Sequence, residues 1–457
     1  MKQYDVIIVG AGPAGIFAAL ELADNSDCSV LLVDKGGPLA KRKCVMHTGQ
    51  ACARCSPCGV LSGWGGAGAF SDGKLTLTPD FGGFLNDYFD ASDLRQKIQC
   101  VDEVYVRYGA QGGLYAETAA EIKDLVRLAA AAGLQLVPAS IRHMGTDRCP
   151  AILQGMFDHL EPRVDILTAT EVEEILATAG RVTGVRTTAG EYRGTYVICA
   201  PGREGSEWFA QQIKQLGLSL SNNPVDIGVR IELPAVILDH LTERVYEPKI
   251  RYYSRMFDDL VRTFCVCPHG EVVVENNRGV LTVNGHSFRD RQTENTNFAL
   301  LVSKTFTEPF TEPIAYGKYI ASLANMLGDG VMVQRLGDLL AGRRSTVRRL
   351  NKGMVRPSLK GATPGDLSLV LPYRHLTNIL EMLEALDKLA PGVYSGQTLL
   401  YGVEVKFYSS RPQLSAELET NIANLFAIGD GAGVTRSLAQ ASVSGVVAAK
   451  SIMSRLR

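Results

Sequence analysis

The sequence predicts an α/β protein, and three observations lead to this prediction. An apolar run over 5–9 is followed by a glycine-rich turn at 10–15, a helix-like apolar period over 16–22 and a second apolar run over 30–33. A similar order of apolar run, glycine turn and helix recurs near the C-terminus. Between them, segments of strand and helix character alternate. Strand, turn, helix and strand in this order form a βαβ unit.

The turn residues fit the binding of a dinucleotide. Gly10 permits the tight turn out of the strand, Gly12 lets the backbone approach a diphosphate, and Gly15 lets helix and strand pack closely. The helix N-terminus directs its N–H groups toward the phosphates. Asp34 ends the second strand, where a carboxylate accepts ribose hydroxyls and disfavours a 2′-phosphate. The spacing therefore predicts a Rossmann-like domain whose first site does not take NADP.

The length and composition of the chain limit the kinds of partner that we expect it to bind. The chain has 457 residues, of which 46% are hydrophobic and 21% charged, and this length is sufficient for two or three domains. A net charge of −1 argues against a nucleic-acid partner. No apolar run reaches the length of a membrane span, and no secretory signal precedes the first strand. We therefore expect a cytoplasmic protein without a membrane span.

A cysteine cluster follows the βαβ unit. Cys44, Cys52, Cys55 and Cys58 are spaced C-x7-C-x2-C-x2-C, and His47 is an alternative ligand. Three closely spaced thiols and a fourth one can surround an iron–sulfur cluster or a zinc ion. Cysteine count does not place the sulfurs in space, so a set of reduced thiols is the alternative interpretation.

A dense glycine run extends over 63–74 and includes Gly66, Ala67 and Gly68. Such a run lets the backbone lie flat against a ligand, so we expect it to contact the dinucleotide. A flexible surface loop is the alternative.

The next segment, 91–159, has mainly helical periodicity. Strand patterns follow it, and we assign these strands to the first domain. The predicted helices are 91–108, 115–132 and 151–160, and a strand is predicted at 134–138. The later predicted strands are 164–168, 171–177, 182–187 and 192–200. His143 lies in a predicted loop and is a candidate proton donor.

From 222 to 396 the pattern indicates a second, α+β domain. Its predicted strands are 225–233, 270–275 and 280–283, and its predicted helices are 313–327 and 377–389. The polar residues that could face a substrate are Arg230, Cys265, Cys267, His286, Glu294 and Asn297. We expect Cys265 and Cys267 to point to alternate faces of a strand, and so not to bind one metal together.

The final segment contains a predicted strand at 424–428, a glycine turn that includes Gly429 and Asp430, and a helix from Thr435. An aspartate after a strand can accept a hydrogen bond from a ribityl hydroxyl. The helix N-terminus can stabilise negative charge at N1–C2=O of a reduced flavin.

Three of these stretches carry a resemblance to known families, and they are 9–15 with Asp34, 63–74 and 427–433. The first and last resemble the glutathione-reductase-like superfamily of FAD enzymes. The glycine run and upstream cysteines resemble a bacterial family described as FAD-dependent (NAD(FAD)-utilising) dehydrogenases. Three further stretches also look like the latter family, and they are 224–230, 262–267 and 294–302.

The resemblance implies bound FAD and a discontinuous FAD-binding domain. This domain would consist of 1–90, 160–221 and 397–457, interrupted by the helical insertion 91–159 and the substrate domain 222–396. The resemblance implies cofactor contacts at Gly10, Gly12, Gly15, Asp34, Val172, Gly202 and Asp430. The neighbouring residues that we also predict to bind the cofactor are Pro13, Ala14, Lys35, Gly66, Ala67, Gly68, Ala200, Gly429 and Ala439.

Two features of the wider superfamily are missing from the sequence. There is no C-x4-C redox pair in the helix after the second strand and no second strand-GxGxxG-helix unit. We therefore expect NAD(P)H only as a transient donor, or an electron carrier in its place.

The predicted activity is that of an FAD-dependent oxidoreductase, in which flavin N5 exchanges a hydride with a small organic substrate. The alternatives are an FAD monooxygenase and an electron-transfer flavoprotein with a cysteine-ligated cluster. The resemblance assigns neither a substrate nor a catalytic residue.

Overall fold

The structure is a computed structural model, and the residues that it describes fall into ranges separated by short gaps. They are 2–45, 53, 55–71, 73–111, 113–115, 120, 122–145, 148–277, 279–287, 292–310 and 312–456.

The chain forms two compact units, each assembled from separate segments. Unit 1 consists of Met1–Leu114, Ile141–Asn223 and Tyr408–Arg457, and unit 2 consists of Tyr115–Ser140 and Pro224–Phe407. The segment predicted as a helical insertion, 91–159, is thus shared between the two units. The domain roles predicted from the sequence stay a prediction.

Unit 1 is built on a seven-stranded, mostly parallel sheet in the order β7-β2-β1-β10-β9-β8, with β22 pairing with β10. Its strands are β1 (Gln3–Val9), β2 (Val30–Val33), β7 (Asp165–Leu167), β8 (Val172–Thr178), β9 (Arg181–Thr187), β10 (Gly190–Cys199) and β22 (Leu425–Ala427). The strands β2, β10 and β22 run parallel to their neighbours in the centre, whereas β9 is antiparallel to β8 and β10. This is the predicted Rossmann-like α/β fold.

Outside this sheet, unit 1 contains α-helices, 3-10 helices and short strands. The helices are α1 (Pro13–Asn25), α2 (Ala91–Arg107), α4 (Cys149–Leu160), α5 (Ser206–Gln215) and α11 (Leu438–Leu456). The 3-10 helices are η1 (Leu39–Lys41), η3 (Gly66–Phe70), η4 (Leu85–Asp87) and η7 (Asp430–Ala432). The small strands are β3 (Lys74–Thr76), β4 (Leu114–Tyr115), β6 (Ile141–His143), β11 (Leu220–Ser221) and β21 (Arg411–Pro412).

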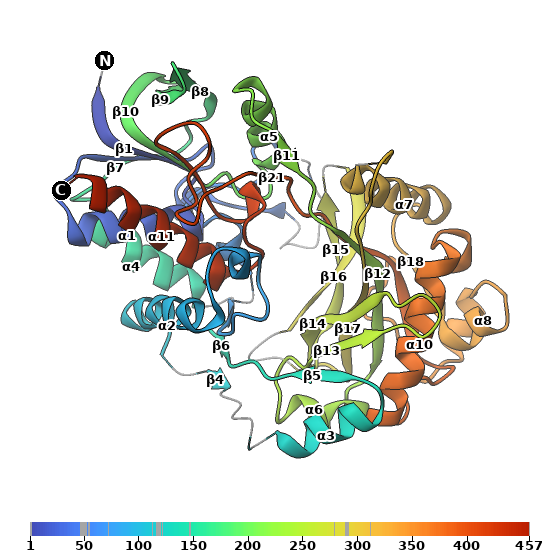
Figure 1. Cartoon of the computed structure of the whole chain (residues 1–457). Coiled ribbons are helices and arrows are strands. Elements are labelled where there is room, and N and C mark those ends of the chain that lie inside the picture. The colour runs from blue at the N-terminus through green and yellow to red at the C-terminus, as the bar shows by residue number, and fades with distance from the viewer. Residues whose placement is uncertain are drawn as a thin grey trace. The chain divides into compact units, whose positions relative to one another are not determined.

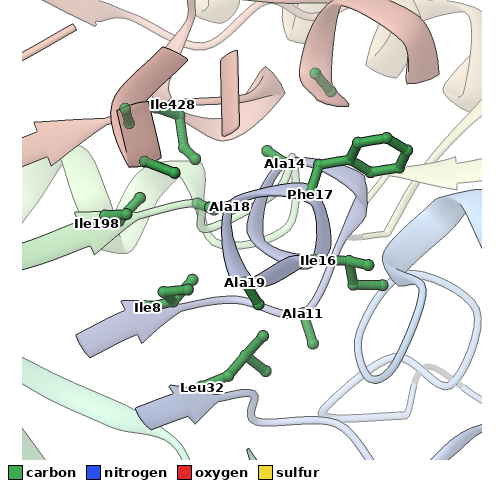
Figure 2. Packing of buried hydrophobic residues seen from close by; sticks show 14 of the residues in the cluster. Ile8, Ala11, Ala14, Ile16, Phe17, Ala18, Ala19, Leu32, Ile198 and Ile428 are labelled. Carbon is green, nitrogen blue, oxygen red and sulfur yellow. The ribbon is translucent and has the colours of Figure 1, made fainter. Parts of the chain in front are cut away.

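The first and last helices of the chain pack side by side in the core of unit 1 (Figure 1). Ile8, Leu32 and Ile198 extend from neighbouring strands toward α1 (Figure 2), and all three are fully buried. Gly445 of α11 faces α1 so closely that an added Cβ would lie 2.1 Å from the carbonyl oxygen of Ala14. The two ends of the sequence therefore form one core.

Unit 2 is built on an eight-stranded sheet in the order β19-β18-β20-β12-β17-β14-β13-β5. Its strands are β5 (Gln135–Val137), β12 (Val225–Pro234), β13 (Lys249–Tyr253), β14 (Leu260–Cys267), β17 (Asn295–Lys304), β18 (Met332–Arg335), β19 (Thr363–Pro364) and β20 (Leu399–Lys406). A separate hairpin consists of β15 (Glu271–Asn277) and β16 (Val280–His286). The helices are α3 (Lys123–Ala131), α6 (Asp239–Thr242), α7 (Pro313–Gly328), α8 (Leu336–Leu340), α9 (Val347–Asn351) and α10 (Tyr373–Leu389), with η5 (Ala235–Ile237) and η6 (Leu367–Leu369).

The central strand β12 alternates apolar and polar side chains, yet both of its faces are buried. Val229 and Ile231 pack in the apolar core with residues of α10. Asp226, Arg230 and Glu232 lie on the other face and are at most 1% exposed. Because buried charges need partners, this face consists of ion pairs and hydrogen bonds rather than solvent-facing side chains.

Two expectations about local structure are wrong. The helix predicted over 115–132 is shorter, since Tyr115 belongs to β4 and stacks on Tyr246, and α3 begins at Lys123. His143 was expected in a loop but lies in β6, where it pairs with Lys74 of β3. Across the described residues, we find no helix with the length and apolar character needed to cross a membrane.

Candidate functional site

A cleft in unit 1 opens above the carboxyl ends of β1 and β2. Eight of the residues that line this cleft are predicted cofactor-binding residues, and they are Gly10, Gly12, Asp34, Lys35, Gly66, Val172, Ala200 and Gly202. In doubly wound sheets, ligands bind at this end of the strands.

The glycine turn leaves the floor of this cleft free of side chains. Gly10 has a φ of +107°, and a Cβ there would lie 2.1 Å from the carbonyl oxygen of Ala200. A Cβ on Gly15 would lie 1.9 Å from the carbonyl oxygen of Gly10. At Gly12, by contrast, the nearest atom to a Cβ would be Cα of Gly66 at 4.0 Å. Gly10 and Gly15 are thus required by the fold, and Gly12 leaves space open.

Helix α1 begins directly at this turn. Gly12 is its N-cap residue, no side chain caps it, and Pro13 occupies the first turn. The first N–H groups of a helix and its positive dipole end favour an anion. Ala14 and Gly15 follow in the same first turn, so the four predicted residues 12–15 form one helix terminus of the kind that can bind an anion.

Asp34 holds the turn together through its carboxylate. Oδ2 accepts a hydrogen bond from the N–H of Ala11 at 2.8 Å, and Oδ1 accepts from the N–H groups of Gly36 at 2.7 Å and Gly63 at 2.8 Å. Burial raises the pKa of Asp34, and the three N–H groups act in the opposite direction. Asp34 lines the cleft, but its two oxygens are already used to join three backbone segments.

Residues of the glycine run 63–74 lie against the first glycine turn and against the start of α11. A Cβ on Gly66 would lie 3.0 Å from Cα of Gly12. A Cβ on Gly68 would lie 3.0 Å from Leu438 at the start of α11 and 3.4 Å from Pro13. Ala67 lies between them in η3, and Ala439 follows Leu438 in α11. The part of the run over 63–71 is therefore packed against the other segments of the site rather than forming the alternative flexible surface loop.

The C-terminal glycine turn closes the same region. A Cβ on Gly429 would lie 3.0 Å from Cβ of Ala14, and a Cβ on Gly431 would lie 2.1 Å from the carbonyl oxygen of Gly202. The three glycine-rich stretches that the sequence singled out thus converge, and Gly202 lies beside the last of them.

Asp430 lies in this turn beside two arginines. Its Oδ1 accepts a hydrogen bond from Oγ1 of Thr435 at 2.7 Å. Burial raises the pKa of Asp430, whereas the charges of Arg203 and Arg436 lower it. The guanidinium of Arg436 stacks on the ring of Tyr408, with 3.3 Å between its central carbon and the ring centroid.

Several residues that line the cleft were not predicted from the sequence. Trp208 of α5 lines it, and its Nε1 donates to the carbonyl oxygen of Glu173 at 3.0 Å. Lys35, which was predicted, forms an ion pair with Glu204 at 2.9 Å, and Glu204 also accepts a hydrogen bond from Ser62. An aromatic residue in the first turn of the helix after the Gly202 turn was the available signal for Trp208.

Arg42 is a second residue that the sequence analysis missed. Its guanidinium donates to the carbonyl oxygens of Gly59, Val60, Trp64 and Gly66 at distances from 2.5 to 3.0 Å. Burial lowers the pKa of Arg42 to about 10. This one side chain therefore fixes the backbone that leads into η3.

The predicted metal site is not supported. Cys52 and the alternative ligand His47 lie outside the described residues. Within the described ranges no group of three or more His, Cys, Asp or Glu side chains could hold a metal ion. Cys44, Cys55 and Cys58 are free thiols, and Cys55 is exposed.

The residues of the cleft fit FAD on structural grounds. The helix terminus offers N–H groups, Gly12 leaves room for a diphosphate, and the C-terminal turn supplies a second contact for an elongated ligand. Trp208 adds an aromatic surface to the wall of the cleft.

Comparisons with known proteins agree with this assignment. The family model "Pyridine nucleotide-disulphide oxidoreductase" matches residues 4–57, which contain the βαβ unit. The family model "FAD-dependent protein, C-terminal domain-like" matches residues 224–407, the longer segment of unit 2. The chain is therefore an oxidoreductase of the broad FAD-dependent kind. The narrower expectation of the glutathione-reductase-like superfamily is not established by these matches.

Individual relatives add little detail. A protein of Clostridium beijerinckii described as "Uncharacterized protein" is 27% identical over 476 residues, which cover 98% of this chain and 80% of that protein. The glycine oxidase structure from Geobacillus kaustophilus is 15% identical, with a TM-score of 0.41 and coverage of 99% and 95%. The L-proline dehydrogenase structure from P. horikoshii is 11% identical, with a TM-score of 0.43 and coverage of 99% and 94%. Structural similarity of this degree carries no argument about activity.

Proposed function

We propose that unit 1 binds FAD in its cleft and that the protein transfers a hydride between flavin N5 and a small organic substrate. The observation that carries this proposal is the open helix terminus at Gly12, bordered by two other glycine-rich stretches. Flavin supplies the redox chemistry when it is bound, and the protein supplies binding, orientation and electrostatics.

The residues divide by the part of the cofactor that they would contact. Gly10, Gly12, Pro13, Ala14 and Gly15 would bind the diphosphate through the helix terminus. Asp34, Lys35, Val172, Ala200 and Gly202 would surround the adenosine, with Asp34 ordering the turn. Gly66, Ala67, Gly68, Gly429, Asp430 and Ala439 would contact the ribityl and flavin portions.

The charges near Asp430 suit the flavin end of this arrangement. The N-terminus of α11 presents its positive dipole end, and Arg436 is a fixed cation close to the same turn. Together they would stabilise negative charge on the pyrimidine side of the ring. Thr435 holds the carboxylate of Asp430 in one orientation, from which it can accept a hydrogen bond from a ribityl hydroxyl.

The electron donor is a separate part of the proposal. A nicotinamide would reduce the flavin only as a transient visitor, or an electron-carrier protein would do so. The organic substrate and the direction of electron flow are to be found by screening reductants and acceptors for bleaching or recovery of flavin absorbance.

The experiment uses Gly12, because a side chain there fits the fold but fills the cleft. Gly12 has a φ of −80°, which any residue adopts, and the nearest atom to a new Cβ is 4.0 Å away. We expect Gly12→Val to bind FAD at least about tenfold more weakly, a loss of about 1.4 kcal/mol, without loss of stability.

A matched control is Gly361→Val, where a Cβ would meet nothing within 4 Å. Its FAD affinity should equal that of the wild type, measured by quenching of flavin fluorescence. A wild-type protein that takes up no FAD, or a Gly12→Val variant with unchanged affinity, contradicts the proposal. Incorporation of oxygen from O₂ into a product would instead identify a monooxygenase.

A further inference from the structure

Two cysteines of unit 2 lie together in a polar cluster far from any glycine motif in the sequence. The sulfur atoms of Cys265 and Cys267 are 3.8 Å apart at the end of β14. The expectation that they point to alternate faces was wrong, because residues two apart on a strand share a face.

The backbone of β14 brings the two thiols closer than a regular strand would. The pairing of β14 with β17 shifts register between Phe264 and Cys267. Cys265 has a φ of +45° within this bulge, a conformation that L-residues other than glycine seldom adopt. Bulges re-aim side chains and are common beside functional sites.

A buried arginine fixes both cysteines. Nη2 of Arg230 donates to the carbonyl oxygen of Cys265 at 2.6 Å and to Sγ of Cys267 at 3.3 Å. The same guanidinium donates to Oδ1 of Asn297 at 2.7 Å and to Glu404 at 3.2 Å. Because thiolate is the reactive form of cysteine, a guanidinium donor at Cys267 favours the reactive form.

The two thiols differ in their access to solvent. Cys265 is partly exposed, whereas Cys267 is fully buried. Of the two residues, only Cys265 is therefore in contact with solvent, where an incoming molecule would meet it first. An accessible thiol with a second thiol behind it is the arrangement of attacking and resolving cysteines in dithiol chemistry.

We propose that Cys265 and Cys267 are a redox-active dithiol that exchanges with low-molecular-weight disulfides. The thiolate of Cys265 attacks a disulfide RSSR, forms a mixed disulfide and releases one RS⁻. The thiolate of Cys267 then attacks the sulfur of Cys265 and releases the second RS⁻, which leaves a Cys265–Cys267 disulfide. The dithiol loses two electrons and two protons, and RSSR becomes two RSH. Closing the bond brings the sulfurs from 3.8 Å to about 2 Å.

The test titrates the full-length, FAD-loaded protein with mixtures of oxidised and reduced glutathione. After acid quenching, unfolding and alkylation, trypsin releases the peptide 263–278, which contains these two cysteines and no other. We expect a form that carries neither alkyl group nor glutathione and is two hydrogens lighter. Its proportion should follow [GSSG]/[GSH]² and pass from one-tenth to nine-tenths over about an 80-fold change in that ratio.

Two outcomes of this titration overturn the proposal. In one, both cysteines are alkylated at every glutathione ratio. In the other, the peptide carries only a glutathione adduct that follows [GSSG]/[GSH] to the first power. The readout is of thiols alone, so it succeeds or fails independently of flavin binding.

Serine variants assign the roles of the two sulfurs. Cys267→Ser should accumulate the glutathione adduct on Cys265, because no second thiol resolves it. Cys265→Ser should form no adduct on Cys267 while the protein is folded, as checked by circular dichroism. Cys100→Ser, at an exposed position on α2, is the matched control and should titrate like the wild type. An adduct on Cys267 in folded Cys265→Ser overturns the assignment.

Discussion

The carboxylate of Asp34 accepts three backbone N–H groups from segments that are distant in sequence. Asp34→Asn exchanges one acceptor oxygen for an amide donor that would face an N–H group. We expect unit 1 to lose about 1–3 kcal/mol of unfolding free energy, and FAD affinity to fall with it. Both tryptophans of the chain, Trp64 and Trp208, lie in unit 1, so urea unfolding followed by tryptophan fluorescence reports on this unit.

An exposed carboxylate of the same unit provides the control for this change. Asp158→Asn, at an exposed position near the end of α4, should leave both the unfolding midpoint and FAD affinity unchanged. Equal effects at Asp34 and Asp158 would show that the three hydrogen bonds do not stabilise the turn.

His375 is a buried histidine on α10 in unit 2, and it makes stability depend on pH. Burial lowers its pKa to about 4, and the charges of Lys304 and Arg374 act in the same direction, while that of Asp259 opposes them. The unfolded chain binds the proton at a pKa of 6.5, so this stabilising contribution is complete above that value and is lost as pH falls toward 4. Between pH 7 and pH 5 the loss is about 2 kcal/mol.

His375→Leu tests this prediction. Neither ring nitrogen has a hydrogen-bond partner among the described residues, so leucine removes two unpaired polar atoms. We expect the variant to be at least as stable as the wild type at pH 7 and to lose about 2 kcal/mol less between pH 7 and pH 5. Urea unfolding followed by circular dichroism measures both quantities. A wild-type pH dependence that survives in the variant would mean that other groups cause it.

For single residues, the sequence predicted several that line the cleft but did not predict the hydrogen bonds that they make. Asp34 was correctly placed at the end of β2, but its donors Gly36 and Gly63 could not be inferred, because the second lies beyond the loop that Arg42 fixes. Trp208 reaches the cleft only because α5 begins beside it. Spacing along the chain predicts backbone conformation and does not report which loops fold back on each other.

Helices α1 and α11 pack against each other, and Gly445 of α11 lies against the backbone of α1. A Cβ there would lie 2.1 Å from the carbonyl oxygen of Ala14 and 2.9 Å from the amide nitrogen of Ala18. Gly445→Ala must therefore push the helices apart. We expect it to destabilise unit 1 by about 1–3 kcal/mol, the usual range for overpacking, and to weaken FAD binding because α11 begins at the flavin end of the site.

The control lies on the exposed side of the same helix. Lys450→Ala should keep the stability of the wild type, since its ammonium is 3.9 Å from Glu21 and the lysine side chain is 62% exposed. Tryptophan fluorescence during urea unfolding compares the two variants. If Gly445→Ala is as stable as Lys450→Ala, the two helices accommodate the added methyl group without loss of unfolding free energy.

Regular elements with a clear period were the most predictable parts of the fold. The strands β1, β2 and β10 and the helices α2, α4, α7 and α10 appear close to the expected bounds. Strands β13, β17 and β20 were missed, because their pattern gives no period that separates a buried strand from a buried helix. The polar side of β12 is buried beneath other chain segments, which no local pattern could show.

Both segments of unit 2 leave and re-enter unit 1 at neighbouring points. The N–H of His143 donates to the carbonyl oxygen of Gly113 at 2.9 Å, on either side of the segment 115–140. Asn223 Nδ2 donates to the carbonyl oxygen of Ser409 at 2.7 Å, on either side of the segment 224–407. Sequence alone indicated an interrupted first domain, but it did not place the boundaries at 114/115 and 140/141, because helical periodicity on both sides of them was assigned to one insertion, 91–159.

Separate cores and adjacent exit points predict that unit 1 folds alone. Short Gly-Ser linkers in place of 115–140 and 224–407 would join ends that already lie side by side, so little loop-closure entropy is lost. We expect this shortened chain to unfold cooperatively, as followed by its two tryptophans, and to bind FAD within about tenfold of the full chain's affinity, a difference of about 1.4 kcal/mol. Turnover should be absent, since the sequence predicts that the substrate domain lies in 222–396. The matched comparison is the same shortened chain with Gly12→Val, which should fold equally well and lose FAD.

A shortened chain that folds but does not bind FAD would show that unit 2 supplies part of the cofactor site. A shortened chain that does not fold would show that the two cores depend on each other.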